Sequence, residues 1–210
     1  QMQILSSGED EAETTAIAKE IQELTTEYEQ LQSLIRSNSP RYAAQTQPQP
    51  LSLERVQREV LDDETLLLEY ALGEDRSFLW VVTDKAFTSH ELPPRAEIEE
   101  SARTVYELLT ARQPQPGDDV REHRTRVREA DAKYWHEATR LSKMVLGSVV
   151  DQLKDQRLLV VSDGLLQYVP LGALPVPGLE RKVHDPTPLI VEHEIVSLPS
   201  ASTLAVLREE

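Results

Sequence analysis

The chain has 210 residues, enough for one or two domains whose core removes roughly 70% of the unfolded surface from water. Its 37 acidic and 22 basic residues give a formal charge of -15, which repels nucleic acid phosphates and anionic lipids, so we expect neither nucleic acid nor membrane partners. No apolar run approaches the roughly 20 residues of a membrane span, and no secretory leader pattern opens the chain, so we expect a cytoplasmic protein. The absence of cysteine excludes a disulfide framework, a thiolate zinc site and a cysteine nucleophile within these residues.

An amphipathic helix is predicted within residues 1–37. Apolar positions there recur alternately every four and every three residues, and Glu, Gln and Lys fill the positions between them. This apolar seam is too short to prove a coiled coil, so it fits packing against the chain's own body, a helical partner, a second copy, or the end of an upstream helical region. The seam consists of Ile17, Ile21, Leu24, Tyr28, Leu31 and Ile35.

Residues 38–50 are rich in Pro and Gln and are predicted to form an extended linker with no core of its own. A domain boundary is therefore expected there, and residues 51–210 are predicted to form one α/β domain. This domain opens with a short amphipathic helix at residues 52–61, for which Ser52 is the expected N-cap.

Three strands are predicted next, at residues 66–72, 77–83 and 86–92. Polar turn residues separate them, so they are expected to pair as an antiparallel meander. A helix is predicted from Pro93-Pro94 to Arg112, then a Pro- and Gly-containing loop and a second, longer helix. The longer helix has one apolar face, formed by Val127, Ala130, Tyr134, Ala138, Leu141, Val145 and Val149.

The segment 157–174 carries the clearest strand pattern of the chain. Leu158 to Val161 form an unbroken apolar run that suits a strand buried on both faces. Asp163-Gly164 favours a two-residue turn, so Leu165 to Val169 are predicted to return as an antiparallel hairpin strand. A buried strand after a helix favours an α/β layered domain with helices flanking the sheet.

A Pro-rich surface loop is expected at residues 175–188. Two more short strands are predicted after it, at residues 189–191 and 195–198. The last predicted element is a helix from Thr203 with Ser202 as its cap.

Few residues carry a pattern typical of catalysis or metal binding. The nearest approach to a metal cluster is His123 with Glu122, Asp118 and Asp119, followed by His136 with Glu137. Neighbours in sequence point apart on a helix, whereas metal ligands need spacing onto one face, so we interpret both groups as solvated helix surface. The five histidines are His90, His123, His136, His184 and His193.

Ser162 follows a predicted strand, as the serine of a nucleophile elbow does. The glycines that flank such a serine are missing, so we interpret the segment as a turn. A self-contained hydrolase that uses Ser162 is kept as an alternative hypothesis. The seven glycines have no phosphate-loop spacing, and the carboxylate pairs lie at element ends or on polar faces. No catalytic, cofactor-binding or metal-binding residue is therefore assigned.

The order of these segments resembles the first half of a CHAT domain. The segments that carry the resemblance are Leu67 to Glu74, Phe78 to Val82, Leu141 to Leu153, Leu159 to Leu174 and Leu189 to Leu204. The resemblance rests on core strands and turns, and it extends over about residues 51–210. CHAT domains are similar to caspases and separases, which are cysteine peptidases of an α/β fold. CHAT domains are often preceded by tetratricopeptide helices.

The resemblance implies a caspase-like layered sheet and a His/Cys dyad in the second half of the domain. That dyad consists of a His followed by Gly and a Cys in a Ser-Ala-Cys-Glu-Thr type segment, and neither motif occurs here. The expected role is the structural and regulatory half of a cysteine peptidase, inactive alone, whose partners are the C-terminal catalytic half and, for the complete enzyme, a peptide substrate. The alternative is a protein-interaction scaffold that docks through the apolar seam.

Overall fold

The structure is a computed structural model. It describes residues 17, 19, 21, 24–28, 30, 31, 34, 38, 39, 50–114, 116–153, 156–178 and 186–208. By its internal contacts the chain divides into Gln1–Pro50 with Val206–Glu210, and Leu51–Ala205. The described residues from 17 to 34 are helical and their side chains are exposed, whereas Ile35 and most of the predicted linker lie outside the described residues.

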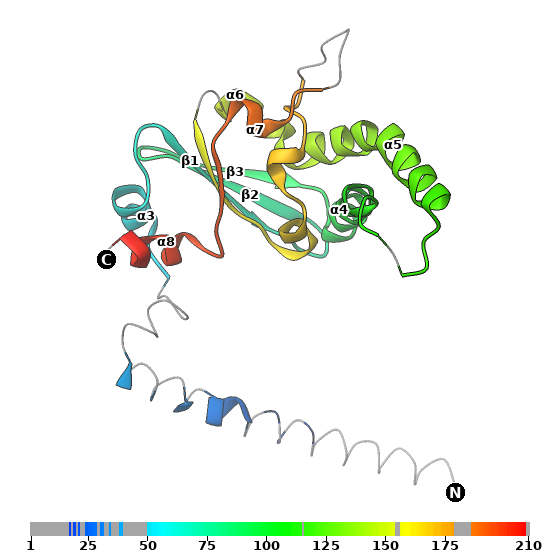
Figure 1. The fold of residues 1–210 in the computed structure, drawn as a ribbon. Helices are drawn as coiled ribbons and strands as arrows, with labels where there is room; N and C mark the ends of the chain where they lie inside the picture. Colours follow the sequence, from blue (N-terminus) through cyan, green and yellow to red (C-terminus); the bar gives the residue numbers. More distant parts are fainter. Residues whose placement is uncertain are drawn as a thin grey trace, which may run out of the picture. The chain divides into compact units, whose positions relative to one another are not determined.

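The unit Leu51–Ala205 is built on a five-stranded mixed sheet, with β1 at its centre (Figure 1). The order across the sheet is β3-β2-β1-β4-β5. β1, β2 and β3 pair antiparallel as the predicted meander, whereas β1, β4 and β5 run parallel. The strands are β1 Thr65–Ala71, β2 Ser77–Val82, β3 Phe87–Leu92, β4 Arg157–Val161 and β5 Ile195–Ser197. The prediction of an α/β fold with helices flanking a sheet is confirmed.

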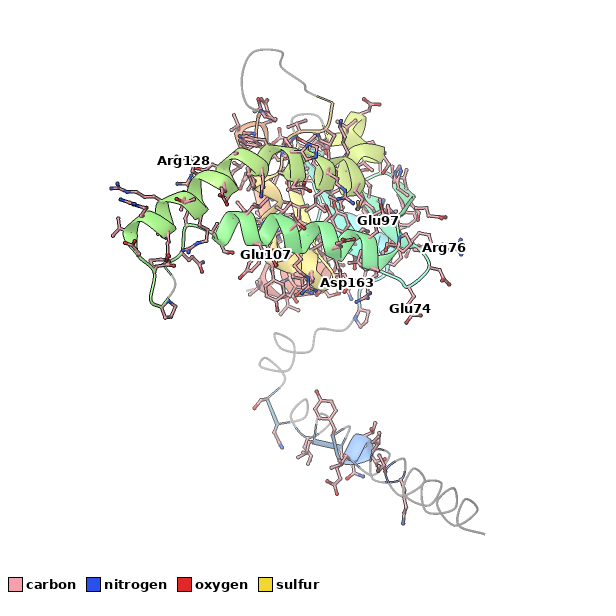
Figure 2. All side chains as sticks on the ribbon, turned by 90° about the vertical axis from the view of Figure 1, so that its right-hand side faces the viewer. Glu74, Arg76, Glu97, Glu107, Arg128 and Asp163 are labelled. Atoms are coloured by element: carbon pink, nitrogen blue, oxygen red, sulfur yellow. The ribbon has the colours of Figure 1, made fainter. Side chains whose placement is uncertain are left out.

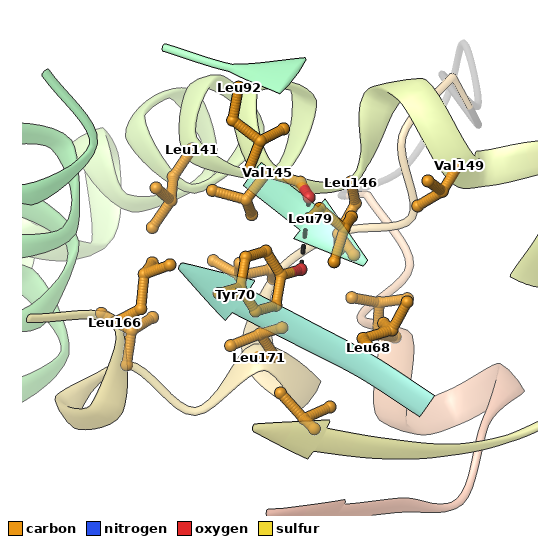
Figure 3. Close-up of a cluster of buried hydrophobic side chains, with 14 of the residues drawn as sticks. Leu68, Tyr70, Leu79, Leu92, Leu141, Val145, Leu146, Val149, Leu166 and Leu171 are labelled. Atoms are coloured by element: carbon orange, nitrogen blue, oxygen red, sulfur yellow. Dashed lines mark hydrogen bonds between the residues drawn. The ribbon is translucent and has the colours of Figure 1, made fainter. Parts of the chain in front are cut away.

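Helices α4 (Arg95–Thr110) and α5 (Val120–Leu146) cover one face of the sheet. Successive residues of a strand point to opposite faces, so Leu66, Leu68 and Tyr70 of β1 face these helices together. The Tyr70 hydroxyl donates a hydrogen bond of 3.2 Å to the Val145 carbonyl (Figure 3). A 3-10 turn at Gly147–Val149 and helix α6 (Val150–Leu153) then lead the chain into β4.

Helices α3 (Leu53–Glu59) and α8 (Ala201–Arg208) lie at the opposite face, where Val56, Val60, Ala201 and Ala205 pack in one cluster with Leu67, Val82, Leu159 and Val161. This arrangement gives three layers in the unit Leu51–Ala205. Ser52 is the N-cap of α3, as predicted, because its side chain accepts a hydrogen bond from the Arg55 amide.

The predicted cap of the last helix is wrong. The Ser200 hydroxyl accepts from the Thr203 amide at 3.2 Å, so Ser200 provides the cap and α8 begins at Ala201. The Ser202 hydroxyl instead accepts from the Leu51 amide at 3.2 Å. It therefore fastens the start of the unit to α8, a contact that local sequence does not reveal.

The predicted hairpin is also wrong. Residues Gly164–Tyr168 form a 3-10 helix, η2, and Leu171–Ala173 form a second one, η3. The reason is that β4 pairs with β1 on one side and with β5 on the other, so no edge remains for an antiparallel partner. The strand predicted before Asp163 is confirmed as β4, and the turn after it is a helical one.

A third correction concerns residues 189–191, which form the short helix α7 (Leu189–Glu192) and not a strand. Pro188 precedes the turn, and the His193 amide closes it by donating to the Leu189 carbonyl at 2.9 Å. Leu189 is buried, whereas Ile190 and Val191 are 66% and 67% exposed. The neighbouring prediction of a strand at residues 195–198 is confirmed as β5.

Candidate functional site at the carboxyl ends of β4 and β5

The parallel strands β4 and β5 end at the same edge of the sheet, and a hollow of about 300 Å³ lies there. Its polar lining comes from the Ser162, Gln167 and Ser197 side chains. The apolar lining consists of Val160, Leu166, Val169, Leu198 and Pro199. Ligands of open α/β sheets bind outside the carboxyl ends of parallel strands, so this edge is the candidate site.

Asp163, the residue next to this hollow, joins three segments of the chain. Its Oδ2 accepts a hydrogen bond of 2.8 Å from the Leu72 amide, at the end of β1. The same oxygen lies 3.4 Å from the Arg95 guanidinium of α4 (Figure 2 labels Asp163 beside this helix). Arg95 also donates to the Leu72 carbonyl at 2.6 Å. We call this group, Leu72, Arg95 and Asp163, the carboxyl-end latch.

Gly164 contacts the other carboxylate oxygen of Asp163. Its amide donates to Asp163 Oδ1 at 2.7 Å, and its φ of 55° lies in the left-handed region that favours glycine. A Cβ at this position would overlap Glu99 Oε1 and would lie 3.2 Å from Leu72 Cδ1. Glu99 in turn accepts from the Leu165 amide at 3.4 Å. The tight turn thus requires glycine for both its conformation and its space.

Ser162 has no catalytic base beside it among the described residues. Its hydroxyl forms no hydrogen bond with any described group, and the described histidines make their contacts elsewhere. His90 contacts Thr88 and Gln152, and His193 Nδ1 lies 3.0 Å from the Gln156 carbonyl, at the start of β4. His184 lies outside the described residues. A nucleophile needs a base within hydrogen-bond reach, so the described part of the chain does not support a serine hydrolase.

The acidic group around His123 is occupied by an arginine. Arg126 donates to both carboxylate oxygens of Asp118, at 2.8 and 2.6 Å, and lies 3.0 Å from His123 Nδ1. The hydrogen bonds with Asp118 raise the pKa of Arg126, which keeps this side chain charged. His136 Nε2 lies 3.9 Å from Glu137 Oε1 on an exposed surface. The described residues contain no group of three or more candidate ligands for a metal ion.

The sequence indicates a turn at Asp163-Gly164 but does not indicate the contribution of Arg95 or of Ser197. The Asp-Gly pair after an apolar run was the available signal, and it indicated a turn. Arg95 is 68 positions away from Asp163, and nothing in the local pattern of either residue indicates the contact. Ser197 enters the hollow only because β5 pairs with β4.

No known family model matches this chain, and no curated protein matches it. No helix among the described residues combines the length and the apolar character that a membrane crossing needs.

Proposed function

We propose that this chain is the non-catalytic half of a caspase-like cysteine peptidase of the CHAT type. In this role it buttresses and regulates a His/Cys active site located beyond residue 210 or on another chain. The observation that carries the proposal is the outer edge of β5. Among the described residues β5 pairs only with β4, so a parallel strand stands at the edge of the sheet.

A parallel edge strand leaves a row of backbone N–H and C=O groups available to a further strand. Parallel strands are usually buried on both faces, whereas Ile195 and Val196 of β5 are half-buried and Ser197 is exposed, which favours further structure packed at β5. The exposed Ile190 and Val191 of α7 come directly before this strand and supply apolar surface that a docked domain would cover. The proposed catalytic half therefore adds its strands at β5.

The carboxyl-end latch supports the same proposal. Asp163 and Arg95 hold the ends of β1 and β4 in fixed positions without contributing a nucleophile or a base. A rigid support of this kind is what a neighbouring active site needs, because small displacements of catalytic groups are costly. In the proposed role this chain positions the site and the other half performs the chemistry.

The test is hydrolysis of fluorogenic peptide amides by the protein with its proposed catalytic half, supplied as the residues that continue the chain or as a second protein. We expect cleavage by the combined protein, no cleavage by residues 1–210 alone, and loss of cleavage when the cysteine of the catalytic half is changed to alanine. Cleavage that survives this change would contradict the proposal. So would a continuation and partner set that contain neither a Cys nor a His-Gly pair.

A second candidate is a protein-interaction scaffold without peptidase activity. The observation in its favour is the seam of the N-terminal helix, where Ile17, Ile21, Leu24, Tyr28 and Leu31 are 51 to 61% exposed. A row of exposed apolar side chains at helical spacing is typical of a surface that binds another helix. The two proposals differ in the surface they use, so each can be tested separately.

A further inference from the structure

Among the described residues, one half of a sheet face carries no core packing. On the face covered by α3 and α8, the buried cluster includes Leu67 and Val82 but ends there along β1 and β2. Glu69, Ala71, Phe78 and Trp80 continue the same face, because they lie two and four positions from those residues. All four are half-buried, and none belongs to a core cluster among the described residues. We call these four residues the uncovered patch.

Glu69 is the polar member of the uncovered patch, and no described group compensates its charge. It forms no hydrogen bond or ion pair among the described residues. Burial raises the pKa of its carboxyl, since desolvation disfavours the charged form. A partly desolvated carboxylate without a partner costs free energy that a nearby cation would recover.

The neighbouring position on the same face combines an aromatic ring with an exposed carboxylate and a cation. Phe78 pairs across the strands with Glu91, and the Arg76 guanidinium lies 5.4 Å from the centre of the Phe78 ring. Arg76 also lies 3.7 Å from Glu91 Oε2, and Figure 2 shows it at the turn between β1 and β2. An aromatic ring, a carboxylate and a guanidinium thus form one unit.

Trp80 and Glu69 provide the aromatic ring and the carboxylate of a similar unit, but no guanidinium among the described residues joins them. They are direct cross-strand partners in the register of β1 and β2. An indole ring attracts a cation more strongly than a phenyl ring does. The Trp80–Glu69 pair therefore has the chemistry to hold an Arg or Lys side chain.

We propose that the uncovered patch binds a basic segment of another protein, which places an Arg or Lys side chain against Trp80 and Glu69 and apolar residues against Ala71 and Phe78. The formal charge of -15 favours a basic partner and disfavours a nucleic acid at long range. This surface is separate from the β5 edge, so it goes beyond the proposed function and does not depend on it.

The two tryptophans of the chain give a test with an internal reference. Trp80 belongs to the uncovered patch. Trp135 lies on α5, where its ring packs edge-on against that of Tyr134, with 5.0 Å between the ring centres. The probes are an amphipathic peptide of Leu, Ala and Arg, the same peptide with Glu in place of every Arg, and a single-stranded DNA. We expect the arginine peptide to shift the Trp80 indole N–H signal in a nitrogen-15 NMR spectrum with saturation and to leave the Trp135 signal in place.

The variant Glu69→Gln removes the charge and keeps the size of the side chain. We expect it to weaken binding of the arginine peptide at least about ten-fold, on the scale of a charge pair shielded from water. Glu97→Gln, an exposed change on α4 that alters the net charge equally, is the matched control and should bind as the original protein does.

Three outcomes would overturn the proposal: equal shifts at both tryptophans, unchanged binding in Glu69→Gln, or equal binding of the glutamate peptide or the DNA. The comparisons among the three probes, and between the Trp80 and Trp135 signals, use the unaltered protein. They therefore test the proposal even if a variant fails to fold.

Discussion

Asp163 is the residue on which the carboxyl-end latch depends. Its carboxylate accepts from the Leu72 and Gly164 amides and faces the Arg95 guanidinium. Asp163→Ala removes all three interactions, and we expect it to lower the free energy of unfolding by about 1–2 kcal/mol, because amide donors lose their acceptor. Urea unfolding followed by circular dichroism measures the change. Asp163→Asn keeps one acceptor oxygen and should lose less, and equal losses would show that the oxygen that Asn retains contributes nothing to stability.

Gly164 allows a second prediction at this scale, with another glycine as control. Gly164→Ala adds a Cβ at a φ of 55° and against Glu99. Gly117→Ala also adds a Cβ at a positive φ, of 88°, but with nothing within 4 Å. The backbone conformation alone costs about 1–2 kcal/mol. We therefore expect both variants to be destabilised and Gly164→Ala to lose more, as measured by thermal unfolding. Equal losses would mean that the contact with Glu99 relaxes without cost.

At the scale of elements, helix α7 and strand β5 form the proposed docking edge. Val191 and Val120 are both 67% exposed, but Val120 begins α5 and belongs to no proposed surface. Val191→Asp should leave stability within about 0.5 kcal/mol of the original, as exposed substitutions do, and should weaken association with the proposed catalytic half. Val120→Asp should change neither quantity. Calorimetric titration measures the association, and equal binding by the two variants would contradict the role of α7.

The mixed pairing of the sheet explains why the strand predicted at residues 165–169 is a helical turn instead. A strand needs a neighbour with a free edge, and β4 has a parallel neighbour on each side. Leu165 to Val169 therefore had no place beside β4. Their apolar residues Leu166 and Val169 are still buried in the core, Leu166 within the 3-10 helix η2 and Val169 at its end. Their hydrophobicity was identified correctly, but short apolar runs do not distinguish a strand from a helical turn.

At the scale of the whole molecule, the apolar seam tests the scaffold alternative. Changing Leu24 and Leu31 to Asp places two charges on the exposed seam. If the seam joins copies of this chain, the mass measured by light scattering should fall to that of a single chain, because the charges would be buried in the contact. An unchanged mass and an unchanged stability would argue that the seam is not a binding face.

The sequence by itself determined the α/β class, the meander, the two long helices and the strand β4. Each has a periodic pattern of apolar residues over many positions, and that pattern reflects which side of the element meets the core. The cap at Ser52 was also predictable, because a cap involves residues three positions apart.

Only the tertiary structure decided the conformation of segments 165–169 and 189–191, the cap of α8, the partners of Asp163 and the cross-strand position of Glu69 beside Trp80. These depend on which strands pair and on residues far apart in the chain, such as Leu51 with Ser202 or Arg95 with Asp163. Local propensity carries no information about such contacts, because the free energy that selects them comes from burial and hydrogen bonding between distant segments.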